Sequence, residues 1–367
     1  MIRSLTSLIR NPPPHWTAGR PRTEGSQALR TTVHAVPLRV RSFFFILAVI
    51  VLSAAGGCRP ASPPKTEGAA SAMRGSPPAG KLNVTSVIFP SYDFVRVIAG
   101  DRVNLVMLLP PGAESHSYEP SPRDIVTIKE SDLFIYPGGE NDKWVDRILE
   151  SVNDTGGKMK TLKLVDQVDT VEEELIEGME DDGNAAETGS HLVYDEHVWT
   201  SPRNAKSIVI SIAEALCDLD PANAEFYLKN VADYTARLDE LDASFRSIVD
   251  GAKRKTIVFG DRFPFRYFVD AYGLKYYAAF PGCSTETEPS AATVAFLINK
   301  IKTEHIPVVF HIELSNEKMA DTISEATGAE KLLLHSCHNV TRKDYENGVS
   351  YLDLQKVNAE HLREALW

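Results

Sequence analysis

One long amphipathic helix near the middle of the chain most constrains its fold. Residues 220–252 begin with Asp220 and Pro221, which suit the N-cap and the first helical position, and Gly251 closes the run. Apolar side chains recur between them at helical spacing, at Tyr227, Val231, Tyr234, Leu238, Leu241, Phe245 and Ile248. About 30 residues at ~1.5 Å each span roughly 45 Å, so this helix can join two lobes as a rigid strut.

Strand-like and helical patterns alternate on both sides of this helix. In the first half we expect strands at 82–89, 103–109, 132–136 and 161–165, with helices near 91–99, 121–130 and 141–151. In the second half we expect strands at 255–259, 274–280, 307–312 and 331–335, with helices near 264–272, 289–304, 315–327 and 353–366. Such alternation predicts βαβ units and parallel sheets. The predicted fold class is therefore α/β, with two lobes that are each a mainly parallel four-stranded sheet flanked by helices, joined by one long rigid helix.

The N-terminal residues have the composition of a signal region and a tether. Residues 1–57 form the predicted signal region, and a start codon placed too far upstream is one explanation for its length. Its apolar stretch of about 13 residues is shorter than the ~20 that span a bilayer, and suits a signal peptide. It ends in Gly-Gly-Cys58, which resembles a bacterial lipobox with Cys58 as the lipidated residue; an ordinary signal peptide is the alternative. Residues 58–80 are rich in Pro, Ala, Ser and Gly and predict a flexible tether. The rest of the chain divides into an N-terminal lobe at 81–219, the linking helix at 220–252 and a C-terminal lobe at 253–367.

Composition narrows the classes of partner. Of the 367 residues, 43% are hydrophobic and 24% are charged, which is typical of a soluble globular protein. The net charge of −11 argues against nucleic acid or an anionic membrane surface as the main partner, and favours cations. Acidic residues gather at 166–190, where we expect a solvated mobile loop; a loop that collects cations beside the site is the alternative.

Two histidines lie in distinctive loops. His116 lies in Pro110-Pro-Gly-Ala-Glu-Ser-His-Ser-Tyr-Glu-Pro-Ser-Pro122, directly after the second predicted strand. The prolines preset φ and so stiffen this loop, whereas Gly112 allows its turn. In α/β sheets, ligands bind at such strand ends. His197 lies in Asp195-Glu-His-Val-Trp-Thr-Ser-Pro202, before the start of a helix. His197 alone is weak evidence of a site, because a histidine beside a tryptophan is more often a packed, hydrogen-bonded residue than a ligand.

Together the two loops resemble the cluster A-I substrate-binding proteins, which are zinc- and manganese-binding lipoproteins of bacterial ABC importers. The resemblance runs from about residue 81 to residue 367 and includes the long helix. It implies that His116 and His197 coordinate a metal. It also implies a monomeric, extracytoplasmic protein, lipid-anchored to the membrane and without enzymatic activity, which passes a divalent transition metal to an ABC-transporter permease.

The remaining ligands depart from the pattern of that family. The third ligand there is usually a histidine, and the matching residue here is Arg262, which has no lone pair to offer. The fourth falls on His335 in Leu-Leu-Leu-His-Ser-Cys-His-Asn339. We therefore predict a roughly tetrahedral site of His116, His197 and His335 with one carboxylate or water, and keep His338 as a substitute for His335. Three imidazoles favour Zn²⁺, whereas Mn²⁺ calls for more carboxylate.

Charge sets a condition on Arg262. An arginine about 5 Å from a divalent ion repels it by roughly 6–7 kcal/mol at an effective dielectric constant of ~20, against a micromolar binding energy of about 8 kcal/mol. Arg262 must therefore point away or be neutralised. Asp261 could ligate the metal, Glu313 could pair with Arg262 or lie near the site, and Glu114 could approach the metal.

Three alternatives stay open at this stage. Cys283 and Cys337 each follow a predicted strand and could form a disulfide if those strands are neighbours, or could ligate metal. A three-histidine zinc site with a bound water is also the plan of some hydrolases. Arg262 and the histidines could instead bind an anion or a metal chelate.

Overall fold

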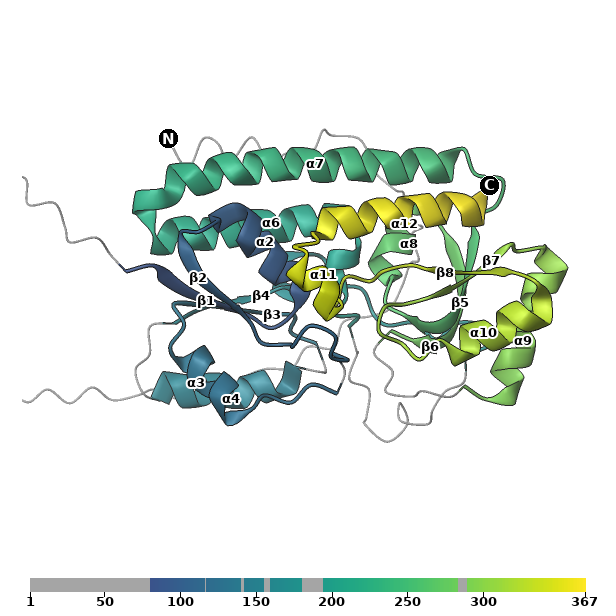
Figure 1. The fold of residues 1–367 in the computed structure, drawn as a ribbon, viewed down its shortest axis with the longest axis horizontal. Helices are drawn as coiled ribbons and strands as arrows, with labels where there is room; N and C mark the ends of the chain where they lie inside the picture. The colour runs from purple at the N-terminus through teal and green to yellow at the C-terminus, as the bar shows by residue number, and fades with distance from the viewer. Residues whose placement is uncertain (1–79, 116, 140–141, 155–158, 180–193, 283–288) are drawn as a thin grey trace, which may run out of the picture. The chain divides into compact units, whose positions relative to one another are not determined.

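Two parallel four-stranded sheets form the frame of the protein (Figure 1). The structure is a computed structural model, and it describes residues 80–115, 117–139, 142–154, 159–179, 194–282 and 289–367. The first sheet has the order β2-β1-β3-β4, with strands Leu82–Ser86 (β1), Val103–Met107 (β2), Leu133–Tyr136 (β3) and Lys160–Lys163 (β4). The second has the order β6-β5-β7-β8, with strands Thr256–Phe263 (β5), Lys275–Pro281 (β6), Val308–His311 (β7) and Glu330–Leu333 (β8). The predicted fold class is confirmed.

Helices flank each sheet (Figure 1). The first sheet has on one side Phe89–Ala99 (α2) and Pro202–Leu219 (α6), and on the other Pro122–Lys129 (α3) and Lys143–Asp154 (α4). The second sheet contacts Ala291–Glu304 (α9), Lys318–Thr327 (α10) and Tyr351–Leu366 (α12), and Arg266–Tyr272 (α8) lies near it. A short helix that the sequence pattern did not predict, Arg342–Glu346 (α11), precedes α12. None of the helices in the described part of the chain is long and apolar enough to cross a membrane.

The predicted linking helix is present but begins later than expected. Pro221–Asn223 form a 3-10 turn, and the α-helix α7 covers Ala224–Asp250, whose 27 residues span about 40 Å. It contacts α2 and α6 from the first half and α8 and α12 from the second. Every apolar side chain of the predicted stripe is at most 6% exposed. The stripe therefore packs against both halves of the protein.

Strand β5 extends further than the sequence pattern indicated. Its pairing with β6 is irregular between Phe259 and Arg262, and it continues to Phe263. A side chain at Gly260 would bring a Cβ within 2.6 Å of the Cα of Ala320, so α10 packs directly on the strand there. Asp261 and Arg262 consequently lie within the end of a strand, on a rigid element.

Part of the acidic segment is docked against the second half. The Glu174 carboxylate pairs with Arg266 at 2.7 Å, and the Glu177 carboxylate pairs with Lys300 at 3.2 Å. Within residues 166–179 of the predicted solvated loop, two carboxylates are thus paired with basic side chains of α8 and α9. The rest of this segment lies outside the described residues, as do Cys58 and the predicted signal region.

Candidate metal site

His197 is oriented by a neighbouring carboxylate. Its side chain is 0% exposed, at the start of the 3-10 turn Val198–Thr200. One oxygen of Asp195 accepts both the backbone N–H of His197, at 2.7 Å, and its Nδ1–H, at 2.9 Å. Burial lowers the pKa of His197, but Asp195 and further acidic residues raise it, and the net pKa lies above its ordinary value. A neutral ring that donates from Nδ1 keeps its lone pair on Nε2, which is the atom that a metal binds.

His338 packs against this ring. The two imidazole centroids lie 5.4 Å apart, and the Trp199 ring lies 5.0 Å from that of His338. Nδ1 of His338 lies 3.2 Å from the hydroxyl of Ser115, the residue directly before His116. His116 itself lies outside the described residues. The loop 335–340 therefore brings His338 both to the His197 loop and to the segment that leads into His116.

His335 occupies a different place in the same loop. Its Nδ1 accepts the backbone N–H of Cys337 at 2.9 Å and lies 3.5 Å from a carboxylate oxygen of Glu313. Cys337 has a positive φ of 64°, and the chain reverses between the two histidines. Sequence reasoning placed His335 in the site and kept His338 as its substitute, whereas these contacts favour the opposite order.

Glu313 holds the His338 loop. Its side chain is 7% exposed. It accepts the backbone N–H of Ser336 at 2.7 Å, the Ser336 hydroxyl at 2.6 Å and the backbone N–H of His338 at 2.9 Å. Both carboxylate oxygens are thus used within this loop. The ion pair that the structure gives for Arg262 is with Glu114 rather than with Glu313.

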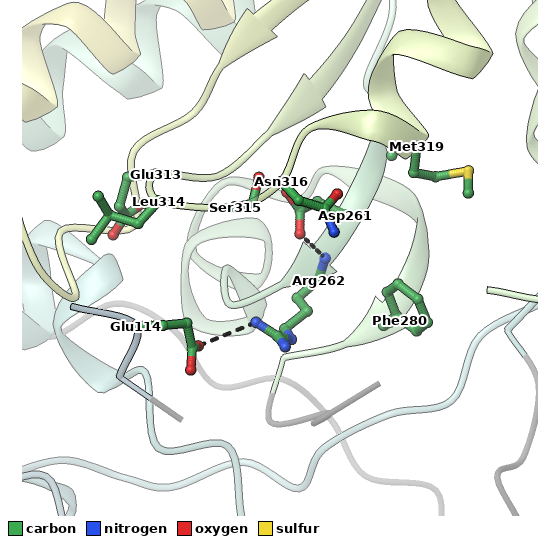
Figure 2. A pocket seen from close by; sticks show the side chains of 10 residues that line it. Glu114, Asp261, Arg262, Phe280, Glu313, Leu314, Ser315, Asn316 and Met319 are labelled. Carbon is green, nitrogen blue, oxygen red and sulfur yellow. Dashed lines mark hydrogen bonds and ion pairs between the residues drawn. The ribbon is translucent and has the colours of Figure 1, made fainter. Parts of the chain in front are cut away.

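Arg262 is instead paired with Glu114 (Figure 2). The guanidinium Nη1 lies 3.3 Å from the Glu114 carboxylate, and the two side chains are 12% and 38% exposed. The nearby Asp261 carboxylate accepts the backbone N–H groups of Arg262, at 2.8 Å, and of Ile312, at 3.2 Å, and burial raises its pKa. These acids and Arg262 line a cavity of about 220 Å³ at the ends of β5 and β7. The charge of Arg262 is therefore neutralised, as a nearby cation site requires.

Two buried carboxyl groups near the histidines were missed by sequence reasoning. Asp142 and Glu196 line one small cavity together with His338 and Ser115. Burial, and then the charge of Glu196, raises the pKa of Asp142 to about 7. Glu196 could have been noticed because it directly precedes His197. Asp142 belongs to no motif, and only the fold brings it here.

Cys337 is one of the two cysteines that could form a disulfide, and it lies within the described residues. Cys337 is a free thiol, 0% exposed, and its Sγ lies 3.5 Å from Nε2 of Gln355. Burial raises its pKa well above the ordinary value. Cys283, the other cysteine of that possible pair, lies outside the described residues. Cys217 is also a free and buried thiol.

The described residues bring two possible metal ligands, His197 and His338, side by side. Among them, with His116 excluded, no three His, Cys, Asp or Glu side chains are arranged to hold a metal ion. His197 and His338 can offer two imidazole ligands, so a complete site there needs a further ligand. The segment at Ser115 leads directly to one in the sequence.

This fold, with two parallel sheets spanned by one long helix and histidines at the strand ends, defines a two-lobe solute-binding protein. Residues 84–365 match the family described as "Zinc-uptake complex component A periplasmic", ZnuA. The chain belongs to this family. The family consists of solute-binding transport components rather than enzymes, which agrees with the expected absence of catalysis.

Similar proteins of known name and structure agree with this assignment. The "High-affinity zinc uptake system protein ZnuA" of Bacillus subtilis is 31% identical over 287 residues, which cover 78% of this chain and 88% of that protein. The "Zinc-binding lipoprotein AdcA" of Streptococcus pneumoniae is 32% identical over 288 residues, and the match spans only 56% of its length. The Zn(II)-bound ZnuA-like domain of Streptococcus pneumoniae AdcA has a TM-score of 0.64 at 29% identity, covering 78% of this chain and 99% of that domain. The metal-dependent lipoprotein YcdH of Bacillus subtilis has a TM-score of 0.66 at 29% identity, covering 78% and 100%.

Proposed function

We propose that this protein is an extracytoplasmic solute-binding protein that captures Zn²⁺ and delivers it to the permease of an ABC importer. The observation that carries the proposal is the packing of His338 against His197, next to the segment that leads into His116. Membership of a zinc-uptake family supports it. The relatives named for zinc binding support the choice of metal.

The proposed ligands are His116, His197 and His338, with water or a carboxylate in the fourth position. His338 takes the place that we first gave to His335, because its ring lies against His197. Three neutral imidazoles in a tetrahedral arrangement suit Zn²⁺ better than Mn²⁺, which prefers more oxygen ligands. Capture is coordination without bond-making chemistry, since the imidazoles need only be deprotonated to bind.

Nearby charges support a cation over an anion. Three neutral ligands leave the ion its full positive charge. The buried carboxylates of Asp195 and Glu196 directly precede His197 in the chain and can offset that charge. Arg262, the one residue that favours an anion or a chelate, already pairs with Glu114. The carboxylates of Asp261 and Glu313 line the cavity that Arg262 also lines, and they would repel an anion there. We therefore do not adopt the anion-binding alternative.

We further propose the attachment of the protein to the membrane. Residues 1–57 act as a signal region, Cys58 carries the lipid and residues 58–80 are the tether of a monomer. The lobe boundaries at 81–219, 220–252 and 253–367 complete the proposed organisation. The lipoprotein name of the AdcA relative supports the anchor. Mass spectrometry of the mature protein tests it: an acylated N-terminal Cys58 is expected, and an unmodified N-terminus elsewhere would contradict it.

Calorimetric titration of the purified full-length chain tests the binding function. One equivalent of Zn²⁺ is expected to bind tightly, Mn²⁺ more weakly, and phosphate or citrate not at all without metal. His197→Ala is expected to abolish tight zinc binding. Metal-independent binding of the anions, or unchanged zinc affinity in His197→Ala, would reject the proposal.

A further inference from the structure

We infer that Asn339 positions the zinc site by clamping the segment before His116 onto the loop that carries His338. The inference rests on the proposed function for its consequence, but the clamp itself is a feature of the described residues. Asn339 is not a proposed ligand. It acts through the two segments that it joins.

The amide of Asn339 bridges two distant parts of the chain. Its side chain is buried, with the residue 1% exposed. Nδ2 donates to the carbonyl oxygens of Pro110, at 2.8 Å, and Ala113, at 2.9 Å. Oδ1 accepts the backbone N–H of Val340 at 2.9 Å. Both N–H groups of the amide are thus spent on the loop that follows β2, more than 220 residues away in sequence.

Neighbouring bonds continue the same contact. The backbone N–H of Gly112 donates to the carbonyl of Val340 at 2.8 Å, and the Ser115 hydroxyl lies 3.2 Å from Nδ1 of His338. Gly112 has a φ of +85°, a conformation that favours glycine and turns the segment toward residue 340. The loop after β2 is therefore bonded to residues 338–340 along its length.

The other side of the clamp is fixed to the second half of the protein. Glu313, at the end of β7, holds the backbone of Ser336 and His338 through its buried carboxylate. Asn339 follows His338 directly, and its side chain bonds this anchored loop to residues 110–113. The Asn339 amide thus adds two bonds to the Gly112–Val340 and Ser115–His338 contacts that set the relative position of His338 and the His116 segment. Partners of this kind, which orient metal ligands without touching the metal, typically contribute about 10- to 100-fold to metal affinity.

Asn358 provides a matched control. It is 2% exposed, and its amide brackets His335, accepting the backbone N–H at 2.7 Å and donating to the carbonyl at 2.8 Å. It therefore holds the same loop through the same chemistry as Asn339. Its bonds, however, go to the His335 end of the loop and to Gln355, on its own helix α12.

The test compares Asn339→Asp with Asn358→Asp in the purified full-length chain. Each change preserves size and replaces an N–H donor by an oxygen that faces carbonyl groups. Zinc affinity is measured by competition with a chromophoric chelator, ligand geometry by the visible absorption of the Co²⁺ form, and mobility of residues 110–115 by hydrogen exchange without metal. Asn339→Ala repeats the measurements without a new charge, in case Asn339→Asp fails to fold.

For Asn339→Asp we expect zinc affinity to fall about 10- to 100-fold, the Co²⁺ spectrum to change and exchange at Gly112 and Ala113 to accelerate. Asn358→Asp is expected to keep the wild-type spectrum and nearly the wild-type affinity. Equal losses in both variants, or wild-type affinity and spectrum in Asn339→Asp, would overturn the positioning role. If the wild-type chain binds no zinc, the proposed function fails, and hydrogen exchange still decides whether Asn339 clamps the segment.

Discussion

The Arg262 guanidinium lies 3.3 Å from the Glu114 carboxylate, which joins the end of β5 to the loop two residues before His116. Because this ion pair neutralises the arginine, a cation could bind in the same part of the molecule. Without Glu114, the positive charge of Arg262 would oppose any divalent ion bound nearby.

Glu114→Gln is therefore expected to weaken zinc binding by about tenfold or more, because the charge of Arg262 is left uncompensated. Adding Arg262→Met should restore most of the affinity, since it removes the repulsion. Calorimetry at low and high salt checks both variants, and the loss should shrink as salt increases. A double variant that binds no better than Glu114→Gln would show that Glu114 acts in some other way.

Asp195→Asn is expected to lower zinc affinity by about 10- to 100-fold, because the amide orients the His197 ring less firmly and carries no charge. Competition titration measures the loss, and NMR of the imidazole nitrogens reports whether Nδ1 keeps its proton. Asp218→Asn is the control, since it removes an equal charge from a side chain that is 74% exposed and pairs with Lys160. Equal effects of the two variants would mean that only net charge matters.

The candidate histidines His116 and His197 could be predicted from the sequence because each lies in a short, recognisable motif. Proline-framed His116 and the Asp195 to Trp199 motif each lie within one loop, and strand and helix patterns located β2 and α6 beside them. The partner of Arg262 could not be read, because Glu114 lies 148 residues away and only the fold joins them. His335 and His338 could not be ranked, because the chain reverses at Cys337 through a positive φ that a non-glycine residue rarely adopts.

The raised pKa of Asp142 should make the stability of the metal-free protein depend on pH. Its pKa rises from 3.8 to about 7 on folding, so between these values the folded state binds more protons than the unfolded state. Stability is therefore expected to fall as pH increases from about 4 to about 7, by at most about 4 kcal/mol. Urea titrations of the wild type and Asp142→Asn, in chelator, measure this slope. Asp142→Asn should flatten it, and an identical slope in both proteins would contradict the assignment.

A substitution in the core of the long helix α7 is expected to lower stability without changing zinc binding. Phe245 is 0% exposed, and its ring packs edge-on against Phe268 at a centroid distance of 4.9 Å. Phe245→Ala should lower the free energy of unfolding by about 3–5 kcal/mol, since it leaves a cavity between α7 and α8. Chemical denaturation measures the loss, and zinc titration of the folded variant should give the wild-type affinity. A loss below about 1 kcal/mol would mean that the helix is not packed as described.

The identity of the third histidine tests the account most directly. Zinc affinity and stoichiometry of the full-length chain should be compared among the wild type, His338→Ala and His335→Ala, with metal content measured by elemental analysis. We expect His338→Ala to lose tight binding of the single zinc ion, and His335→Ala to retain one equivalent at nearly the wild-type affinity. Retention of tight zinc by His338→Ala, with its loss in His335→Ala, would contradict the account and return His335 to the site.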